Sequence, residues 1–150
     1  MSEESALREL LEVMTTLRAP GGCPWDRAQT HVSLKRHLLE ETYEVIDAID
    51  AENDEALCEE LGDLLLQVIF HAQIAADRGA FTMEDVIRGI SKKMIHRHPH
   101  VFGEQTGIET PDDVMNIWEV LKSQEGKKDK PKNLLDIPRV LPALLRALKL

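Results

Sequence analysis

The sequence predicts an all-α fold, and three observations support this prediction. Apolar residues recur with the 3.6-residue period of a helix. No stretch of any length alternates apolar and polar residues as a half-buried strand does. Of the 150 residues, 43% are hydrophobic but only 4% are aromatic, so an aliphatic core is expected, as in helical bundles.

The first helix is predicted over residues 3–18, where the apolar residues form one stripe. Its members are Leu7, Leu10, Leu11, Met14 and Leu17. A segment rich in proline and glycine, residues 19–26, then ends the helix. The same periodicity predicts a second helix over residues 31–50 and a third over residues 54–77, with Gly79 suited to the end of the third.

Two further helices have recognisable first turns. Thr82 is a good N-cap with Asp85 three residues later, and this helix should end before Pro99, because a residue that precedes proline avoids the α region. Thr110, followed by a proline and two acids, predicts a fifth helix that runs to about Gln124.

The expected domain organisation is one helical domain over residues 1–126. Residues 127–150 should be a lysine-rich connector followed by the start of a further apolar helix. Because that helix opens so close to the last residue, we expect the chain to be the first part of a longer protein, or the helix to pack on a partner.

Four carboxylates in two mirrored pairs are the strongest indication of function: Glu41 with Glu44, and Glu60 with Asp63. Residues three apart share one helix face and lie about 4.5 Å apart along the axis. If residues 50–54 form a turn, the antiparallel helices set Glu41 level with Asp63, and Glu44 level with Glu60. Like charges this close raise one another's pKa unless a cation compensates them, so the spacing predicts a metal site.

An all-carboxylate site suits a hard cation, and one with open positions is typical of Mg²⁺ bound together with phosphates. A di-iron site would need Glu-x-x-His on two helices, and an EF-hand would need a twelve-residue loop; the sequence has neither. A solvated acidic face remains the alternative for the two pairs, and it explains Glu52, Asp54 and Glu55 better than metal binding does.

The composition excludes several classes of function. A net charge of −9 argues against direct nucleic-acid binding and against binding to anionic membranes. The apolar runs are too short to span a bilayer, and no signal-peptide pattern is present. Cys23 and Cys58 form no C-x-x-C motif, which is consistent with the reducing cytoplasm.

Taken in order, five motifs resemble those of the MazG family of nucleoside triphosphate pyrophosphohydrolases over essentially the whole chain. They are Cys23-Pro24-Trp25-Asp26, Gln29-Thr30-His31, the paired Glu40-Glu41-x-x-Glu44 and Glu60-x-x-Asp63, Arg97-His98-Pro99-His100-Val101-Phe102, and Asp136-Ile137-Pro138-Arg139. The resemblance implies an all-α NTP pyrophosphohydrolase fold whose four-helix-bundle core is completed by dimerisation.

The resemblance also implies the reaction: Mg²⁺-dependent hydrolysis of a nucleoside triphosphate to a monophosphate and pyrophosphate, with Mn²⁺ able to substitute. The implied metal ligands are Glu41, Glu44, Glu60 and Asp63, the residues that the spacing also selects. Glu40 is then a neighbouring or alternative ligand. Family members often carry two such domains in tandem, of which only one need be catalytic.

Three cations are candidate phosphate ligands: Lys93, Arg97 and Lys122. Arginine's planar fork and lysine's point charge both suit phosphate. From the sequence alone, solvated surface cations are the better interpretation of the two lysines, and the resemblance favours Lys93 and Arg97 as ligands. His96, His98 and His100 are expected to belong to a loop that packs on the bundle or closes over the triphosphate, rather than to bind a transition metal.

The two tryptophans, Trp25 and Trp118, could each stack on a nucleobase, although packing in the core or the dimer is the default. Asp26 could bond a base or ribose, or cap the next helix. His71 is expected to be a satisfied polar residue of the core.

In the expected mechanism, Glu40 or Glu41 orients the attacking water. Two alternatives stay open: a catalytically silent MazG-like domain that serves dimerisation or nucleotide capture, and a bundle whose acidic stripe binds a basic protein partner.

Overall fold

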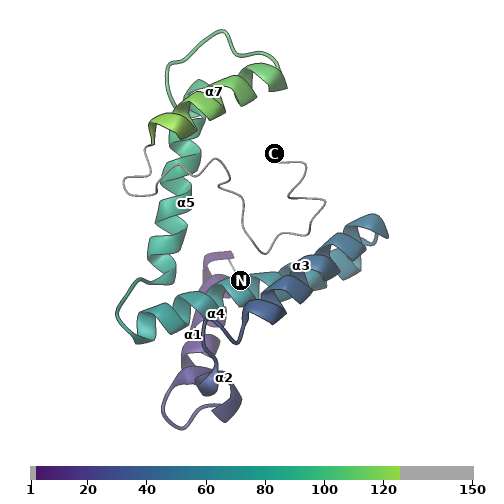
Figure 1. Cartoon of the computed structure of the whole chain (residues 1–150), viewed down its shortest axis with the longest axis vertical. Coiled ribbons are helices and arrows are strands. Elements are labelled where there is room, and N and C mark those ends of the chain that lie inside the picture. The colour runs from purple at the N-terminus through teal and green to yellow at the C-terminus, as the bar shows by residue number, and fades with distance from the viewer. Residues whose placement is uncertain (1–2, 126–150) are drawn as a thin grey trace. The chain divides into compact units, whose positions relative to one another are not determined.

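The structure is a computed structural model that describes residues 3–125 (Figure 1). Every regular element in this range is a helix, which confirms the all-α prediction. The chain divides into two compact units, Met1–Lys92 and Lys93–Leu150, and each is described here by itself. The predicted connector and further helix at residues 127–150 lie outside the described residues. In the part of the chain that is described, no helix is both long enough and apolar enough to cross a membrane.

The first unit is built on two long helices, α3 (Lys35–Asp50) and α4 (Asp54–Asp77), which run side by side (Figure 1). Its helices are α1 (Glu3–Arg18), α2 (Pro24–Ala28), α3 (Lys35–Asp50), α4 (Asp54–Asp77) and the first part of α5 (Met83–Arg97). The turn between α3 and α4 contains Glu52 at a φ of 52°, and Asn53 then caps α4 by accepting from the N–H groups of Glu55 and Ala56. The expected turn at residues 50–54 is therefore present, and it places the two acidic pairs on adjacent helices.

Both bounds of two helices match the sequence, and two other details do not. The bounds of α1 and α4 are those predicted. The helix predicted from residue 31 begins at Lys35, because Thr30 and Ser33 exchange side-chain to backbone hydrogen bonds of 2.9 and 3.1 Å that hold a turn. Helix α2 was not predicted, since Pro24 was interpreted as part of a loop, whereas it occupies the first helical turn, where proline is tolerated.

The core of the first unit lies where α1 crosses α4. Its buried residues are Met14, Leu34, Ile69, Phe70 and Ile74. Four of the five are aliphatic or methionine, as the composition predicted. At the edge of this core, Arg18 of α1 donates to Asp77 of α4 at 2.7 Å and thereby ties the ends of the two helices together.

The second unit contains the end of α5, the short α6 (Pro99–Phe102) and α7 (Pro111–Gln124). As predicted, α5 ends just before His98 and Pro99. Thr110 and Asp113 form a capping box at the start of α7: the Asp113 N–H donates to the Thr110 hydroxyl at 3.3 Å, and the Thr110 N–H donates to the Asp113 carboxylate at 3.0 Å. Helix α6 was missed because a single turn of four residues leaves no periodicity to detect.

Candidate functional site

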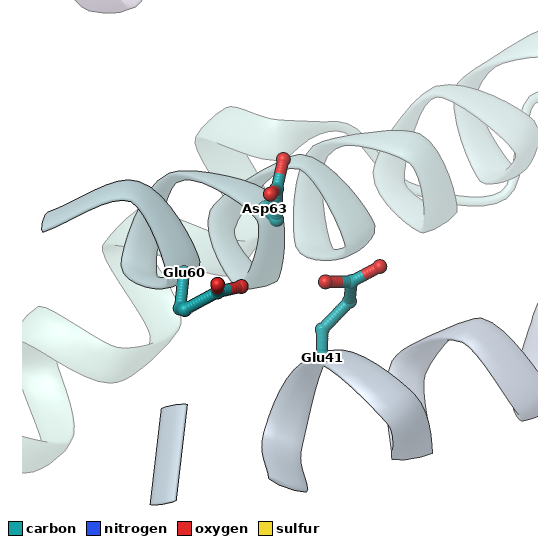
Figure 2. A group of neighbouring side chains, drawn as sticks. All are labelled: Glu41, Glu60 and Asp63. Atoms are coloured by element: carbon teal, nitrogen blue, oxygen red, sulfur yellow. The ribbon is translucent and has the colours of Figure 1, made fainter. Parts of the chain in front are cut away.

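Three of the four predicted metal ligands meet between α3 and α4. Glu41 reaches from α3 toward Glu60 and Asp63 on α4 (Figure 2). Each residue offers one carboxylate oxygen, and these oxygens lie within 4.8 Å of one another. Glu41 and Glu60 are partly buried, whereas Asp63 is exposed. Three carboxylate oxygens that converge from two helices form a group that could hold a metal ion, and hard divalent cations prefer such ligands.

The electrostatics of this trio show that the described part of the chain supplies no cation to compensate its charges. Burial, followed by the charges of Glu44 and Asp63, raises the pKa of Glu41 above its ordinary value. Burial also raises the pKa of Glu60, and the neighbouring charges of Glu44 and Glu59 raise it further. Among residues 3–125, no cationic side chain contributes to either shift. The carboxylates therefore repel one another in the protein alone, as the spacing predicted.

Glu44, the fourth predicted ligand, lies outside the group of three oxygens but next to it. Its charge acts on both Glu41 and Glu60 and raises the pKa of each. Glu40 differs from all four, since its carboxylate accepts from Arg36 at 2.7 Å and lies 3.6 Å from the Nδ1 of His37. Glu40 is thus held by cationic or titratable neighbours on its own helix.

Trp25 stands at the side of α3 and α4 with 54% of its surface exposed. The edge of His37 meets its ring at a centroid distance of 6.0 Å, and Phe70 meets it at 6.3 Å, both nearly perpendicular. This packing fixes the indole and leaves much of it accessible, as a stacking residue requires. Asp26, in the same helix, does not cap α3: the N-cap of α3 is Leu34, and no side chain bonds there, so the capping interpretation is wrong.

Of the predicted phosphate ligands, Arg97 has the most defined surroundings. It belongs to the second unit, where its Nε and Nη2 donate to the two oxygens of Glu125 at 3.0 and 2.6 Å. Its guanidinium also lies over the ring of Trp118, 5.1 Å from the centroid. Arg97 and Trp118, both predicted from the sequence as substrate-binding residues, are therefore neighbours. Glu125 contacts Arg97.

The remaining cations and histidines of the second unit are less constrained. Lys122 lies 3.6 Å from Glu119 on an exposed surface. Lys93 has no ion pair within the described residues. The Nδ1 of His98 donates to the Met94 carbonyl at 2.6 Å, and the His98 ring meets Trp118 edge-on. Within residues 3–125 the histidines form no metal-binding group, since the acidic trio is the group of ligands found there.

Two residues that contact predicted site residues were missed from the sequence: His37 and Glu125. His37 contacts both Trp25 and Glu40, and Glu125 holds Arg97. Neither stands in a motif, and Glu125 lies 28 residues from its partner. His71 is only partly satisfied: its Nδ1 bonds that of His31 at 2.8 Å, but its Nε2 is buried with no partner in the described chain.

Comparison with known proteins gives this site a family. The model of the MazG nucleotide pyrophosphohydrolase domain matches residues 29–102, a range that contains the trio, Glu44, Glu40 and Arg97. The chain is also 54% identical over 139 residues to the nucleoside triphosphate pyrophosphohydrolase/pyrophosphatase MazG of Thermotoga maritima. The chain belongs to the MazG family. The resemblance seen in the five motifs is thereby confirmed.

Other relatives place the MazG chain in the same group. It is 48% identical over 143 residues to the nucleoside triphosphate pyrophosphohydrolase of Escherichia coli K12. These alignments include 93% and 94% of the chain but only 52% and 54% of the relatives, so the chain spans about half the length of the curated relatives it matches. The crystal structure of a mazG-related protein from Thermotoga maritima has a TM-score of 0.64 at 28% identity, over 77% of this chain and 98% of that one.

Proposed function

We propose that this MazG domain is a divalent-metal-dependent nucleoside triphosphate pyrophosphohydrolase, which releases a nucleoside monophosphate and pyrophosphate. The observation that carries the proposal is the convergence of Glu41, Glu60 and Asp63 oxygens within 4.8 Å, inside the matched domain and without a compensating cation in the described part of the chain. The relatives named as nucleoside triphosphate pyrophosphohydrolases support the choice of reaction.

The donor set fits Mg²⁺, because all its ligands are carboxylate oxygens. Glu41, Glu60 and Asp63 would hold the ion, with Glu44 as the fourth ligand, and Mn²⁺ would substitute. When bound, the metal neutralises phosphate charge and so favours departure of pyrophosphate.

The chain's own residues bind and orient the reactants in this proposal. Glu40 and Glu41 are the candidates for orienting the attacking water; Arg36 holds the carboxylate of Glu40 in a fixed position. Trp25 offers its exposed ring to the base, with Asp26 beside it. Lys93, Arg97 and Lys122 are the proposed phosphate contacts, and Trp118 packs under Arg97. The cytoplasm is the proposed location.

A homodimer is part of the proposal, and the surface of α3 and α4 supports it. Eight large apolar residues on these two helices are between 36% and 54% exposed. They are Leu38, Leu39, Tyr43, Ile46, Ile49, Leu61, Leu65 and Val68. A second copy of the same helix pair would cover this face and complete a four-helix bundle. Ile46→Glu should then give monomers in light scattering, whereas Val13→Glu on α1 should leave the dimer intact; a monomeric wild type would refute this part.

The test of function is a product assay on the purified chain. Each ribo- and deoxyribonucleoside triphosphate is supplied with Mg²⁺, with Mn²⁺ or with EDTA, and pyrophosphate is scored separately from orthophosphate. Metal-dependent pyrophosphate with monophosphate establishes the activity, and the order of rates gives the preferred nucleotide. Release of orthophosphate, or no turnover by a folded dimer, would exclude it and favour a silent domain used for dimerisation or nucleotide capture.

A further inference from the structure

The pairing of Arg97 with Glu125 leaves one side of the guanidinium available. Glu125 takes the side formed by Nε and Nη2, at 3.0 and 2.6 Å. Nη1, on the outer edge, makes no hydrogen bond within residues 3–125. A guanidinium has two edges that can each grip a pair of oxygens. One edge of the Arg97 guanidinium therefore donates to Glu125, and the other edge can donate to an anionic ligand at the same time.

The orientation of this free edge is fixed by three contacts. Trp118 lies under the guanidinium plane at 5.1 Å, and Glu125 fixes the rotation within that plane. His96 brings its Nδ1 within 3.1 Å of the same Glu125 oxygen that accepts from Nε, so Glu125 is itself held. Only 12% of the Arg97 side chain is exposed, compared with 69% for Arg88 earlier on the same helix.

We propose that Glu125 is a positioning residue, which holds Arg97 so that its outer edge binds a phosphate group. This inference rests on the proposed function, where Arg97 contacts the triphosphate, and it adds the residue that orients that contact. Preorganisation raises affinity because the entropy of fixing a long side chain is lost on folding rather than on binding. The ligand class is a phosphate or pyrophosphate group, either of the substrate or free.

A competing role for Glu125 would be to block Arg97 until phosphate displaces it. The geometry favours positioning, since the side-on pair and the outer edge use different N–H groups, and no displacement is required. The hydrogen bond from Arg97 also holds the pKa of Glu125 down, to about 2, so the carboxylate stays charged at neutral pH. The two roles predict opposite changes in affinity when Glu125 is altered.

The experiment compares Glu125→Gln with Asp112→Asn, which removes one exposed acid from the first turn of α7, the helix that Glu125 follows, and serves as a matched control. For each, KM and kcat are measured with the preferred nucleotide, and the Kd of inorganic pyrophosphate is measured by calorimetry. We expect Glu125→Gln to raise both KM and this Kd about tenfold, on the scale of one charge-assisted hydrogen bond. We expect kcat to change little, because the phosphate contact is made before and during the reaction alike.

Two results would overturn the inference. A lower KM would mean that Glu125 competes with phosphate, and an unchanged KM with a lowered melting temperature would mean that it serves folding alone. Arg97→Lys provides a second variant that leaves Glu125 in place: it keeps the positive charge but loses the two-edged fork. The variant that combines Glu125→Gln with Arg97→Lys should have the same KM and pyrophosphate Kd as Arg97→Lys alone, because each change disrupts the same contact between phosphate and Arg97. Additive losses of affinity would contradict the proposal.

The calorimetric arm keeps this inference separate from the proposed function. If the wild type hydrolyses no nucleotide, the reaction assignment is wrong. Pyrophosphate binding that weakens in Glu125→Gln would still support the positioning of Arg97. If nucleotides are hydrolysed but pyrophosphate binds the wild type and Glu125→Gln equally, the proposed function is supported and the proposed role of Glu125 is wrong.

Discussion

The two units handle clustered charge in opposite ways. In the first, Glu41, Glu60 and Asp63 lie together, and burial with like charges raises the pKa of Glu41 and Glu60. In the second, Arg97 lowers the pKa of Glu125 to about 2. Charges of opposite sign in one cluster stabilise each other. Charges of like sign repel, so such a cluster requires a counter-charge from outside. The comparison supports the proposal that the trio could hold a cation, and it describes the Arg97 pair as compensated within the protein.

The largest expected effect comes from removing a charge from the trio. Glu41→Gln or Asp63→Asn should lower the metal-dependent rate about a thousandfold, because several kcal/mol of charge stabilisation depend on the metal site. The same variants should melt no lower than the wild type when metal is absent, since they relieve repulsion. Rates and melting curves with EDTA measure the two effects.

Glu59→Gln is the matched control for these variants. Glu59 is exposed on α4 beside Glu60, and it is outside the trio. The metal-dependent rate of Glu59→Gln should remain close to that of the wild type. If Glu59→Gln and Glu41→Gln lost activity equally, total negative charge rather than the trio would be responsible, and the contrast between the units would lose its meaning.

The next effect is a difference in how pH changes stability. The folded pKa of Glu125 lies below its ordinary 4.5, so its stabilising contribution is complete above pH 4.5 and is lost as the pH falls toward about 2. The folded pKa of Glu41 lies above 4.5, so its charge destabilises the metal-free protein at neutral pH, and this penalty disappears as the pH falls through that pKa. Without metal, Glu125→Gln should be less stable than the wild type near neutral pH.

Glu41→Gln should differ from the wild type in the opposite direction under the same conditions. Both differences should shrink on acidification, and thermal unfolding followed by circular dichroism across the acid range measures them. Differences of the same sign would show that the two clusters are not opposites.

A smaller pH effect is expected from the hydrogen-bonded pair of His31 and His71, which supplies a third arrangement for the comparison. The rings meet edge to edge, because the Nδ1–Nδ1 distance of 2.8 Å and the two ring radii together make up the centroid separation of 5.1 Å. One nitrogen must donate and the other accept. Burial, then the charge of His31, lowers the pKa of His71 below 6.5.

Stability should therefore fall as the pH drops below 6.5, where the unfolded chain binds a proton that folded His71 does not. His71→Asn, which keeps a hydrogen-bonding group without a titrating ring, should flatten this slope. Nuclear magnetic resonance titration of His71 provides the direct check. A midpoint at or above 6.5 would contradict the prediction.

The sequence predicted the helices and the acidic pairs for a shared physical reason: both depend on local spacing. The 3.6-residue period gave the bounds of α1 and α4, and the i, i+3 spacing placed Glu60 and Asp63 on one face. Helix α2 and the delayed start of α3 were missed because they depend on a proline in a first turn and on Thr30–Ser33 bonds, which have no period.

Partners distant along the chain could not be predicted in the same way. Glu125 contacts Arg97 across 28 residues, and His31 contacts His71 across 40. Such contacts follow from how helices and loops pack, so only the structure joins them. Arg97 was selected from a family motif and Trp118 as one of the two tryptophans, and nothing in the sequence predicted that the two side chains touch.

The smallest expected effects lie at the helix starts on which the two clusters stand. Asn53 caps α4, which carries Glu60 and Asp63, and Thr110 caps α7, which leads to Glu125. Asn53→Ala and Thr110→Ala should each lower the free energy of unfolding by about 1 kcal/mol, while Asn53→Asp and Thr110→Ser should keep most of it. Urea unfolding measures these losses, and kcat should be unaffected. If Asn53→Ala lowered turnover as strongly as Glu41→Gln, the trio would depend on the end of its helix more than on its own charges, and the contrast with the self-compensated Arg97 pair would have to be explained by rigidity instead.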